Sequence, residues 1–173
     1  MKNQKEYLDK LRHSSAHLMA AAVMELWPKA KRAIGPAIED GFYFDFDFGK
    51  VKVTEEDFPK IEAKMREILP TWKAFDKHLL SREEAKNEYP DNPYKHEMIE
   101  EFSENGKKQI SFYKSGKYWD LCRGGHVDHP DRELENFKLL SVAGAYWRGD
   151  EKNKMLTRIY ATAFPNAKEL EDY

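Results

Sequence analysis

Apolar and small side chains recur every three to four residues through the first part of the chain. This spacing predicts a helix over residues 5–27, because no glycine or proline interrupts it and Pro28 follows. The predicted apolar stripe consists of Tyr7, Leu8, Leu11, Ala16, Leu18, Met19, Ala22, Val23 and Leu26. His17 adjoins this stripe, so we expect its imidazole ring to be partly buried.

The period changes to two over residues 42–48, where aromatic and acidic side chains alternate. This alternation predicts a strand with one buried face, and Asp45 and Asp47 are expected on its solvated face. Further strands are expected over residues 51–53, 72–78, 109–114, 117–121, 137–140, 143–147 and 155–164. Further helices are expected over residues 54–68, from residue 81, over 94–102 and from residue 165 to the end. Without an internal repeat or a low-complexity linker, these elements predict a single α+β domain of two layers, a mostly antiparallel sheet with helices packed on it.

Composition agrees with a globular domain and limits its partners. The 173 residues are 35% charged and 40% hydrophobic, with a formal net charge of −2. This charge excludes a broad basic surface, so a nucleic-acid contact needs a local patch. The clearest local group of basic residues consists of Arg148, Lys152, Lys154 and Arg158. It adjoins Tyr146 and Trp147, which is compatible with a nucleic-acid contact or with a solvated turn.

The cellular compartment is predicted from the first residues of the chain and from the number of cysteines. A single cysteine excludes an internal disulfide and is typical of a reducing compartment. The first residues are polar and no stretch reaches membrane-spanning length, so we expect a cytoplasmic protein without a membrane segment. The helical pattern that begins at residue 165 stops at residue 173, which indicates a piece of a longer chain.

Two short stretches contain three of the six histidines and the only cysteine. His13 and His17 are four residues apart in the predicted helix, so their rings leave the same face. Cys122 and His126 have the same spacing, but Gly124 and Gly125 between them predict a tight turn. If the fold brings both stretches together, the result is a cluster of three imidazoles and a thiol.

Three interpretations of this cluster remain open on the residues alone. Three imidazoles and a thiolate suit tetrahedral zinc, although the spacing is not that of a zinc finger. In a metal-free pocket the imidazoles would instead hydrogen-bond a water molecule and a polar substrate. The third possibility is structural, with buried histidines and a small buried thiol. The remaining histidines, His78, His96 and His129, have polar surroundings and are expected at the surface.

The chain resembles the second N-terminal domain of bacterial-type threonyl-tRNA synthetases. The segments that support this resemblance are RHSSAHL (12–18), LWP (26–28), AIGP (33–36), DGFY (40–43), DLCRGGH (120–126) and AGAYWRGD (143–150). They occur in the family's order and cover nearly the whole chain. A related domain is found in alanyl-tRNA synthetases and free-standing editing proteins, but residues 144–150 followed by 155–160 are similar to the threonyl branch.

The resemblance implies a hydrolase that removes serine mistakenly attached to threonine tRNA while sparing threonyl-tRNA. Such a second site is needed because one missing methyl group is worth only about 1–3 kcal/mol of discrimination in the synthetic site. No class II aminoacylation motif is present, so we expect hydrolysis without aminoacylation. The domain is expected over residues 1–165, and residues 166–173 would begin a linker helix to a catalytic domain outside this chain.

Carried over by position, the resemblance implies six site residues. These are His13, His17, Lys95, Asp120, Cys122 and His126. His13 or His126 would position the water, and Lys95 with backbone N–H groups near the glycines would stabilise the oxyanion. Asp120 would orient a histidine or bind the terminal ribose or the seryl amine. Relatives often have a second tyrosine where this chain has Phe44, so a hydroxyl contact is not expected there.

The resemblance also implies partners. The ligand would be the 3′-terminal aminoacyl-adenosine of tRNA, and the full-length enzyme, with catalytic and anticodon-binding domains, would be a homodimer. No cofactor is required for hydrolysis, although zinc at His13, His17, Cys122 and His126 is an alternative. Two other functions remain open: a zinc-binding structural or RNA-binding module without chemistry, and a deacylase of the alanyl type.

Overall fold

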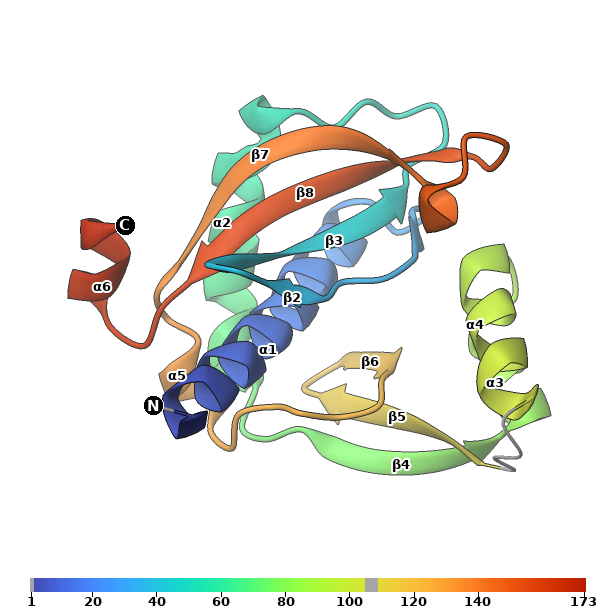
Figure 1. Cartoon of the computed structure of the whole chain (residues 1–173), viewed down its shortest axis with the longest axis horizontal. Coiled ribbons are helices and arrows are strands. Elements are labelled where there is room, and N and C mark those ends of the chain that lie inside the picture. The colour runs from blue at the N-terminus through green and yellow to red at the C-terminus, as the bar shows by residue number, and fades with distance from the viewer. Residues whose placement is uncertain (1, 105–108) are drawn as a thin grey trace.

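A computed structural model describes residues 2–104 and 109–173 as six helices and two sheets. The helices are α1 (Lys2–Leu26), α2 (Phe58–Ile68), α3 (Arg82–Asn87), α4 (Pro93–Glu104), α5 (Pro130–Glu133) and α6 (Ala167–Asp172). The strands are β1 (Lys31–Arg32), β2 (Ala37–Ile38), β3 (Gly41–Asp47), β4 (Asp76–Ser81), β5 (Gln109–Ser115), β6 (Tyr118–Leu121), β7 (Phe137–Tyr146) and β8 (Met155–Ala163). Figure 1 shows the long helix α1 crossing the molecule between the two sheets.

Both sheets are antiparallel. The larger has the order β1-β3-β8-β7, with β2 also paired to β3, and the smaller has the order β4-β5-β6. The α+β class is therefore confirmed, with the strands divided between two sheets. No helix in the described part of the chain combines the length and the hydropathy needed to cross a membrane.

The main core lies between α1, α2 and the larger sheet. The apolar stripe of α1 contributes Leu11, Leu18 and Met19, none of which is exposed. They belong to the same cluster as Phe42 and Phe46 of β3. The helix predicted over residues 5–27 is confirmed, because an unbroken 3.6-residue stripe has a sheet face to cover it.

The prediction that Asp45 and Asp47 lie on a solvated face is wrong. Both carboxylates are buried, and each has specific partners. Arg158 donates from Nε and Nη2 to the two oxygens of Asp45, at 2.8 and 2.9 Å. Asp47 accepts from the Tyr94 hydroxyl at 2.7 Å. Burial of a carboxylate is tolerated here because its lost water is replaced by charged or hydroxyl donors.

Four predicted strands differ from the structure. Residues 51–53 form no strand, because the Val51 N–H closes a turn onto the Phe48 carbonyl at 3.1 Å. The strand expected over 72–78 is β4, which begins only at Asp76. The two strands predicted over 137–147 are one strand, β7, with a register shift between Leu139 and Ser141.

The basic group near Tyr146 and Trp147 is largely neutralised. Arg148 contacts Glu97 and Glu101, at 2.7 and 2.8 Å. Lys154 is 3.1 Å from Asp47, and Arg158 pairs with Asp45 as described above. Because of these ion pairs, we interpret the basic group as part of a turn stabilised within the domain and not as a patch that contacts nucleic acid.

Candidate functional site

Four side chains that are far apart in the sequence meet in one group, here called the His/Cys cluster. His13 and His17 lie one turn apart on α1, whereas Cys122 and His126 lie in the loop after β6. The Nε2 atom of His13 is 3.1 Å from Nε2 of His17 and 3.1 Å from Sγ of Cys122. That sulfur is 3.4 Å from Nε2 of His126. One nitrogen or sulfur atom of each residue lies within 4.8 Å of all the others.

Helix α1 is attached on both sides at the level of the His/Cys cluster. The Val127 N–H, in the loop after β6, donates to Oγ of Ser14 at 3.1 Å. Ser14 is fully buried, and its small side chain lets the loop approach the helix. On the side of the larger sheet, Nε of Arg12 donates to the Ala163 carbonyl at 3.2 Å. The position of the histidines on α1 is therefore fixed by both the loop and the sheet.

The tight turn predicted between Cys122 and His126 is present. Gly124 and Gly125 have φ angles of +108° and +90°, a region that disfavours any residue with a Cβ atom. A Cβ at Gly124 would also lie 2.7 Å from the Tyr113 hydroxyl. The turn brings the Gly124 N–H to 3.4 Å from the Cys122 sulfur. The two glycines thus let a turn with three residues between Cys122 and His126 bring both side chains into the same cluster.

Asp120 lies beside the His/Cys cluster, surrounded by donors. Its side chain is 1% exposed, and one oxygen is 3.2 Å from the Lys95 ammonium and 3.4 Å from the Arg32 guanidinium. The hydroxyls of Tyr89 and Tyr118 both donate to the carboxylate, the latter at 2.8 Å. Burial alone would raise the pKa of Asp120, but the charges of Arg32 and Lys95 outweigh burial and hold it well below its usual value.

The imidazoles of the cluster are held in the neutral form. Burial lowers the pKa of His13 and lowers that of His17 well below its usual value, although the nearby Asp120 opposes both shifts. The pKa of His126 falls to about 3, again mainly through burial. Neutral rings at neutral pH have a free lone pair, which can accept a proton from water or coordinate a metal.

The thiol and the amine of the site also respond to burial. Burial raises the pKa of the Cys122 thiol to about 11, so in the metal-free protein it is protonated at neutral pH and is a poor nucleophile. Burial lowers the pKa of Lys95, while the adjacent Asp120 favours its charged form. Lys95 comes from α4, and its backbone N–H is capped by the Asn92 side chain at 3.1 Å.

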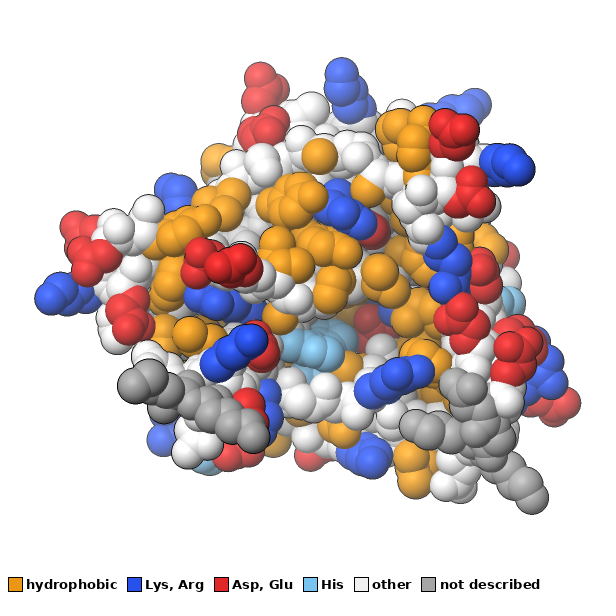
Figure 2. Space-filling model, in the orientation of Figure 1, with side chains coloured by type: hydrophobic (Ala, Val, Ile, Leu, Met, Phe, Trp, Pro, Cys, Tyr) orange, Lys and Arg blue, Asp and Glu red, His pale blue; other side chains and the backbone are white. Residues whose placement is uncertain are grey.

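A cavity of about 450 Å³ opens beside this group. Its lining residues are His13, His17, Ile34, Gly35, Pro36, Phe44, Lys95, Met98, Phe102, Asp120, Leu121, Cys122 and Arg123. Polar side chains thus line one part of the cavity and apolar side chains line the rest, as is typical of sites that bind small molecules. Phe44, without a hydroxyl, contributes only its ring. Figure 2 shows histidine side chains in a hollow near the centre of the visible face.

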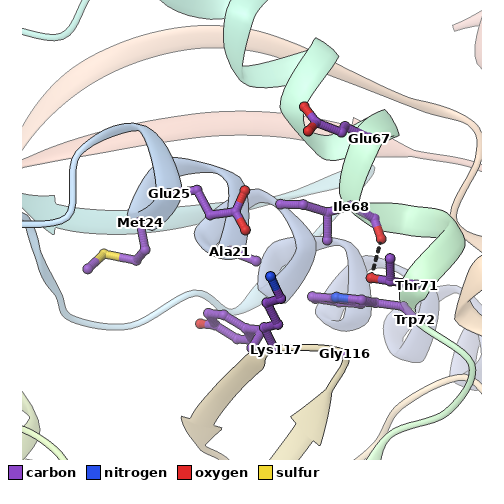
Figure 3. Close-up of a pocket in the computed structure, with 10 residues that line it drawn as sticks. Ala21, Met24, Glu25, Glu67, Ile68, Thr71, Trp72, Gly116 and Lys117 are labelled. Atoms are coloured by element: carbon purple, nitrogen blue, oxygen red, sulfur yellow. Dashed lines mark hydrogen bonds between the residues drawn. The ribbon is translucent and has the colours of Figure 1, made fainter.

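A second cavity, of about 400 Å³, lies between the C-terminal parts of α1 and α2 and the turn joining β5 to β6 (Figure 3). Trp72 and Tyr118 line it with stacked rings whose centres are 5.8 Å apart, and the ring centre of Tyr118 is 5.9 Å from that of His17. Its charged lining residues, Glu25, Glu67 and Lys117, are exposed. In the described ranges, only the His/Cys cluster groups metal-ligating side chains, so the first cavity is the candidate site.

The comparisons with known proteins indicate the family of this chain. Residues 110–160, which include Asp120, Cys122 and His126, match the family described as the threonyl and alanyl tRNA synthetase second additional domain. The chain is 51% identical over 172 residues to threonine–tRNA ligase from Borrelia turicatae and 53% identical over 167 residues to that from Borrelia duttonii. These alignments cover 99% and 96% of this chain. This chain belongs to the family of the threonyl and alanyl tRNA synthetase second additional domain.

In these relatives the aligned region is only part of the ligase chain. The chain spans 29% of the length of the ligase from Borrelia turicatae and 28% of that from Borrelia duttonii. The resemblance identified from the motifs is thus confirmed, whereas the roles of individual residues remain predictions.

The donor set of this second additional domain fits a zinc ion. Zinc bonds of about 2.0–2.3 Å to nitrogen and sulfur place tetrahedral donors roughly 3.3–3.6 Å apart. Three of the separations in the cluster are 3.1–3.4 Å, close to that range. A zinc ion held by all four side chains would have a closed coordination shell, which is typical of structural sites, whereas catalytic zinc keeps a position open for water.

The remaining histidines lie outside the site. His78 and His129 are exposed, as predicted. His96 is partly buried, because its ring lies within hydrogen-bonding distance of the carbonyls of Lys86 and Tyr89. It therefore fixes the segment between α3 and α4 and does not reach the cavity.

Sequence reasoning missed three residues of the site, namely Arg32, Tyr89 and Tyr118. Each contacts Asp120 from a different element or segment. No spacing connects them in the sequence, and Arg32 belongs to a strand of only two residues. A buried aspartate in an expected active site was the single signal, because a carboxylate removed from water requires donors nearby.

Proposed function

We propose that this domain hydrolyses the ester that joins serine to the 3′-terminal adenosine of threonine-specific tRNA, and spares the threonyl ester. The observation that supports this most directly is the pairing of neutral imidazoles with a buried lysine around one cavity of about 450 Å³. Ester hydrolysis needs a base for water and a donor for the oxyanion, and these groups supply both.

In this proposal His13 is the base that activates water. It lines the cavity, as His126 does not, and it contacts both His17 and Cys122. Its lone pair takes a proton from water as the water oxygen bonds to the carbonyl carbon. When the tetrahedral intermediate collapses, the carbon–oxygen bond to the ribose breaks, and the ribose oxygen takes the proton from the imidazolium. Free serine and uncharged tRNA are released.

The oxyanion would be stabilised by Lys95 and by the backbone N–H groups of the glycine turn. Lys95 lines the cavity and has a carboxylate neighbour that favours its ammonium form. Cys122 and Arg123, which line the cavity, lead directly into the turn of Gly124 and Gly125, where the backbone carries no side chain. Discrimination against threonine would be steric, since a cavity wall that contacts the seryl Cβ leaves no space for a further methyl group.

The experiment that tests this function compares two substrates on one preparation. Deacylation of seryl-tRNA and threonyl-tRNA, both on threonine-specific tRNA, is followed by loss of the labelled amino acid. Release of serine with threonine retained supports the proposal. If the folded protein hydrolysed neither seryl-tRNA nor threonyl-tRNA, the proposal that this domain is active by itself would be contradicted. Parallel assays of seryl and glycyl adducts on alanine tRNA distinguish a deacylase of the alanyl type.

A zinc-stabilised module without chemistry is the second candidate, because the four donors of the His/Cys cluster fit a closed site. The hydrolytic proposal predicts that a chelator such as EDTA changes neither the melting temperature nor the deacylation rate. The zinc module predicts a lower melting temperature, because metal binding is linked to folding. Metal content by mass spectrometry, with thermal unfolding before and after the chelator, separates the two. Restoration by zinc and not by magnesium is the control.

A further inference from the structure

Arg32 reaches from the larger sheet into the smaller one. Its Nη1 donates to the Trp119 carbonyl at 3.0 Å and is 3.4 Å from an oxygen of Asp120. The guanidinium carbon is 5.4 Å from the ring centre of Tyr89 and 5.2 Å from that of Tyr118. The same two tyrosines donate their hydroxyls to Asp120. Arg32 is therefore fixed by a carbonyl, a carboxylate and two aromatic rings.

Asp120 thus has two buried cationic neighbours, which differ in chemistry. The guanidinium of Arg32 keeps its proton under all ordinary conditions, and its planar fork is fixed by several partners at once. The ammonium of Lys95 is a compact charge on a flexible stem, and Asp120 is its charged partner within 4.0 Å in the described structure. Lys95 also lines the cavity, whereas Arg32 does not.

We propose that Arg32 is a positioning residue of this site, the permanent counter-ion of Asp120 that leaves Lys95 able to turn its ammonium toward the substrate. This inference rests on the proposed hydrolysis. Without Arg32, Lys95 is the remaining full positive charge beside a buried carboxylate, and the ion pair holds it there. With Arg32 present, Lys95 donates to a developing oxyanion while Asp120 stays neutralised.

A second contact joins Arg32 to the element that supplies Lys95. The carbonyl of Arg32 accepts a hydrogen bond from Nδ2 of Asn92 at 2.7 Å. Oδ1 of Asn92 accepts the backbone N–H of Lys95 at 3.1 Å. Arg32 therefore fixes Asp120 through its side chain and the first turn of α4 through its backbone. Only the first of these contacts is lost when the side chain is replaced.

The kinetic test uses Arg32→Met and Arg32→Lys, with Lys31→Met as the matched control. Lys31 is the neighbouring cation on β1, and adjacent strand residues face opposite sides. For Arg32→Met we expect kcat for seryl-tRNA hydrolysis to fall at least about tenfold, with KM within about threefold, because the lost interaction acts in the transition state. Arg32→Lys should recover part of kcat, and Lys31→Met should match the wild type. Unchanged kcat in Arg32→Met overturns the positioning role.

A thermal-unfolding cycle tests the counter-ion without any substrate. It compares Arg32→Met, Asp120→Asn and the double variant with the wild type. Each single variant should lower the melting temperature, by about 5 °C or more for Arg32→Met. The decrease in melting temperature of the double variant should be clearly smaller than the sum of the two single decreases. In the double variant the carboxylate is gone as well, so no buried carboxylate is left without its Arg32 partner. Additive losses overturn the pairing. If the wild type does not hydrolyse seryl-tRNA but the effects of the two substitutions on melting temperature are not additive, the proposed function is wrong and the ion pair between Arg32 and Asp120 is supported.

Discussion

Replacing His13 by alanine is expected to abolish hydrolysis of seryl-tRNA while the domain stays folded. The imidazole of His13 is the group that lines the cavity and contacts both His17 and Cys122. Loss of a general base lowers the rate by about 10²–10⁴-fold. Because the side chain is only partly buried, its removal leaves little core unfilled, and we expect the melting temperature to change by only a few degrees.

The measurement is the single-turnover rate of serine release, with thermal unfolding on the same sample. His78→Ala is the matched control, since it removes an exposed imidazole from β4 and should leave both quantities unchanged. A His13→Ala variant that releases serine at the wild-type rate would exclude this residue as the base. Loss of activity together with unfolding would instead favour a structural role for the His/Cys cluster.

Replacing Asp120 by asparagine is expected to remove both activity and much of the stability. The carboxylate is 1% exposed, and it is the shared partner of Arg32 and Lys95. Removing one partner of a buried ion pair costs about 3–5 kcal/mol, because the remaining charges are left without compensation. For a domain of this size such a loss lowers the melting temperature by roughly 6–20 °C.

Thermal and urea unfolding of Asp120→Asn check this expectation. The matched control is Asp131→Asn, which removes the carboxylate partner of Lys73 in a pair whose lysine is 75% exposed. An ion pair with one such exposed member contributes at most about 1 kcal/mol, so the control should unfold close to the wild type. If Asp120→Asn were as stable as this control, the three charges would not form the compensated group inferred from their distances.

The elements were predictable where a local pattern determines them. The helix over residues 5–27 was marked by an unbroken period of 3.6, and α1 occupies residues 2–26. The alternation over residues 42–48 likewise located β3. Alternation alone, however, does not distinguish a polar face in water from one buried against a partner. The partner of Asp45 is Arg158, 113 residues away, so the burial of this aspartate had no local signal.

The site shows the same limit more clearly. His13 and Cys122 are 109 residues apart, and only the resemblance to a known family indicated that they meet. The geometry that brings them together depends on packing, on the buried Ser14 and on a hydrogen bond from the loop. Arg32 gave no signal of its own, because a two-residue strand has no period and its role follows from a tertiary contact.

The double attachment of α1 has a consequence for how the domain meets its ligand. Arg12 bonds the end of β8 and Ser14 accepts from the loop after β6, so the helix that presents the histidines can neither rotate nor slide without losing one of these bonds. Little conformational entropy is then left to lose when a ligand enters. The geometry of the His/Cys cluster is preorganised, and in the proposed hydrolysis the free energy of binding would be available for aligning the ester.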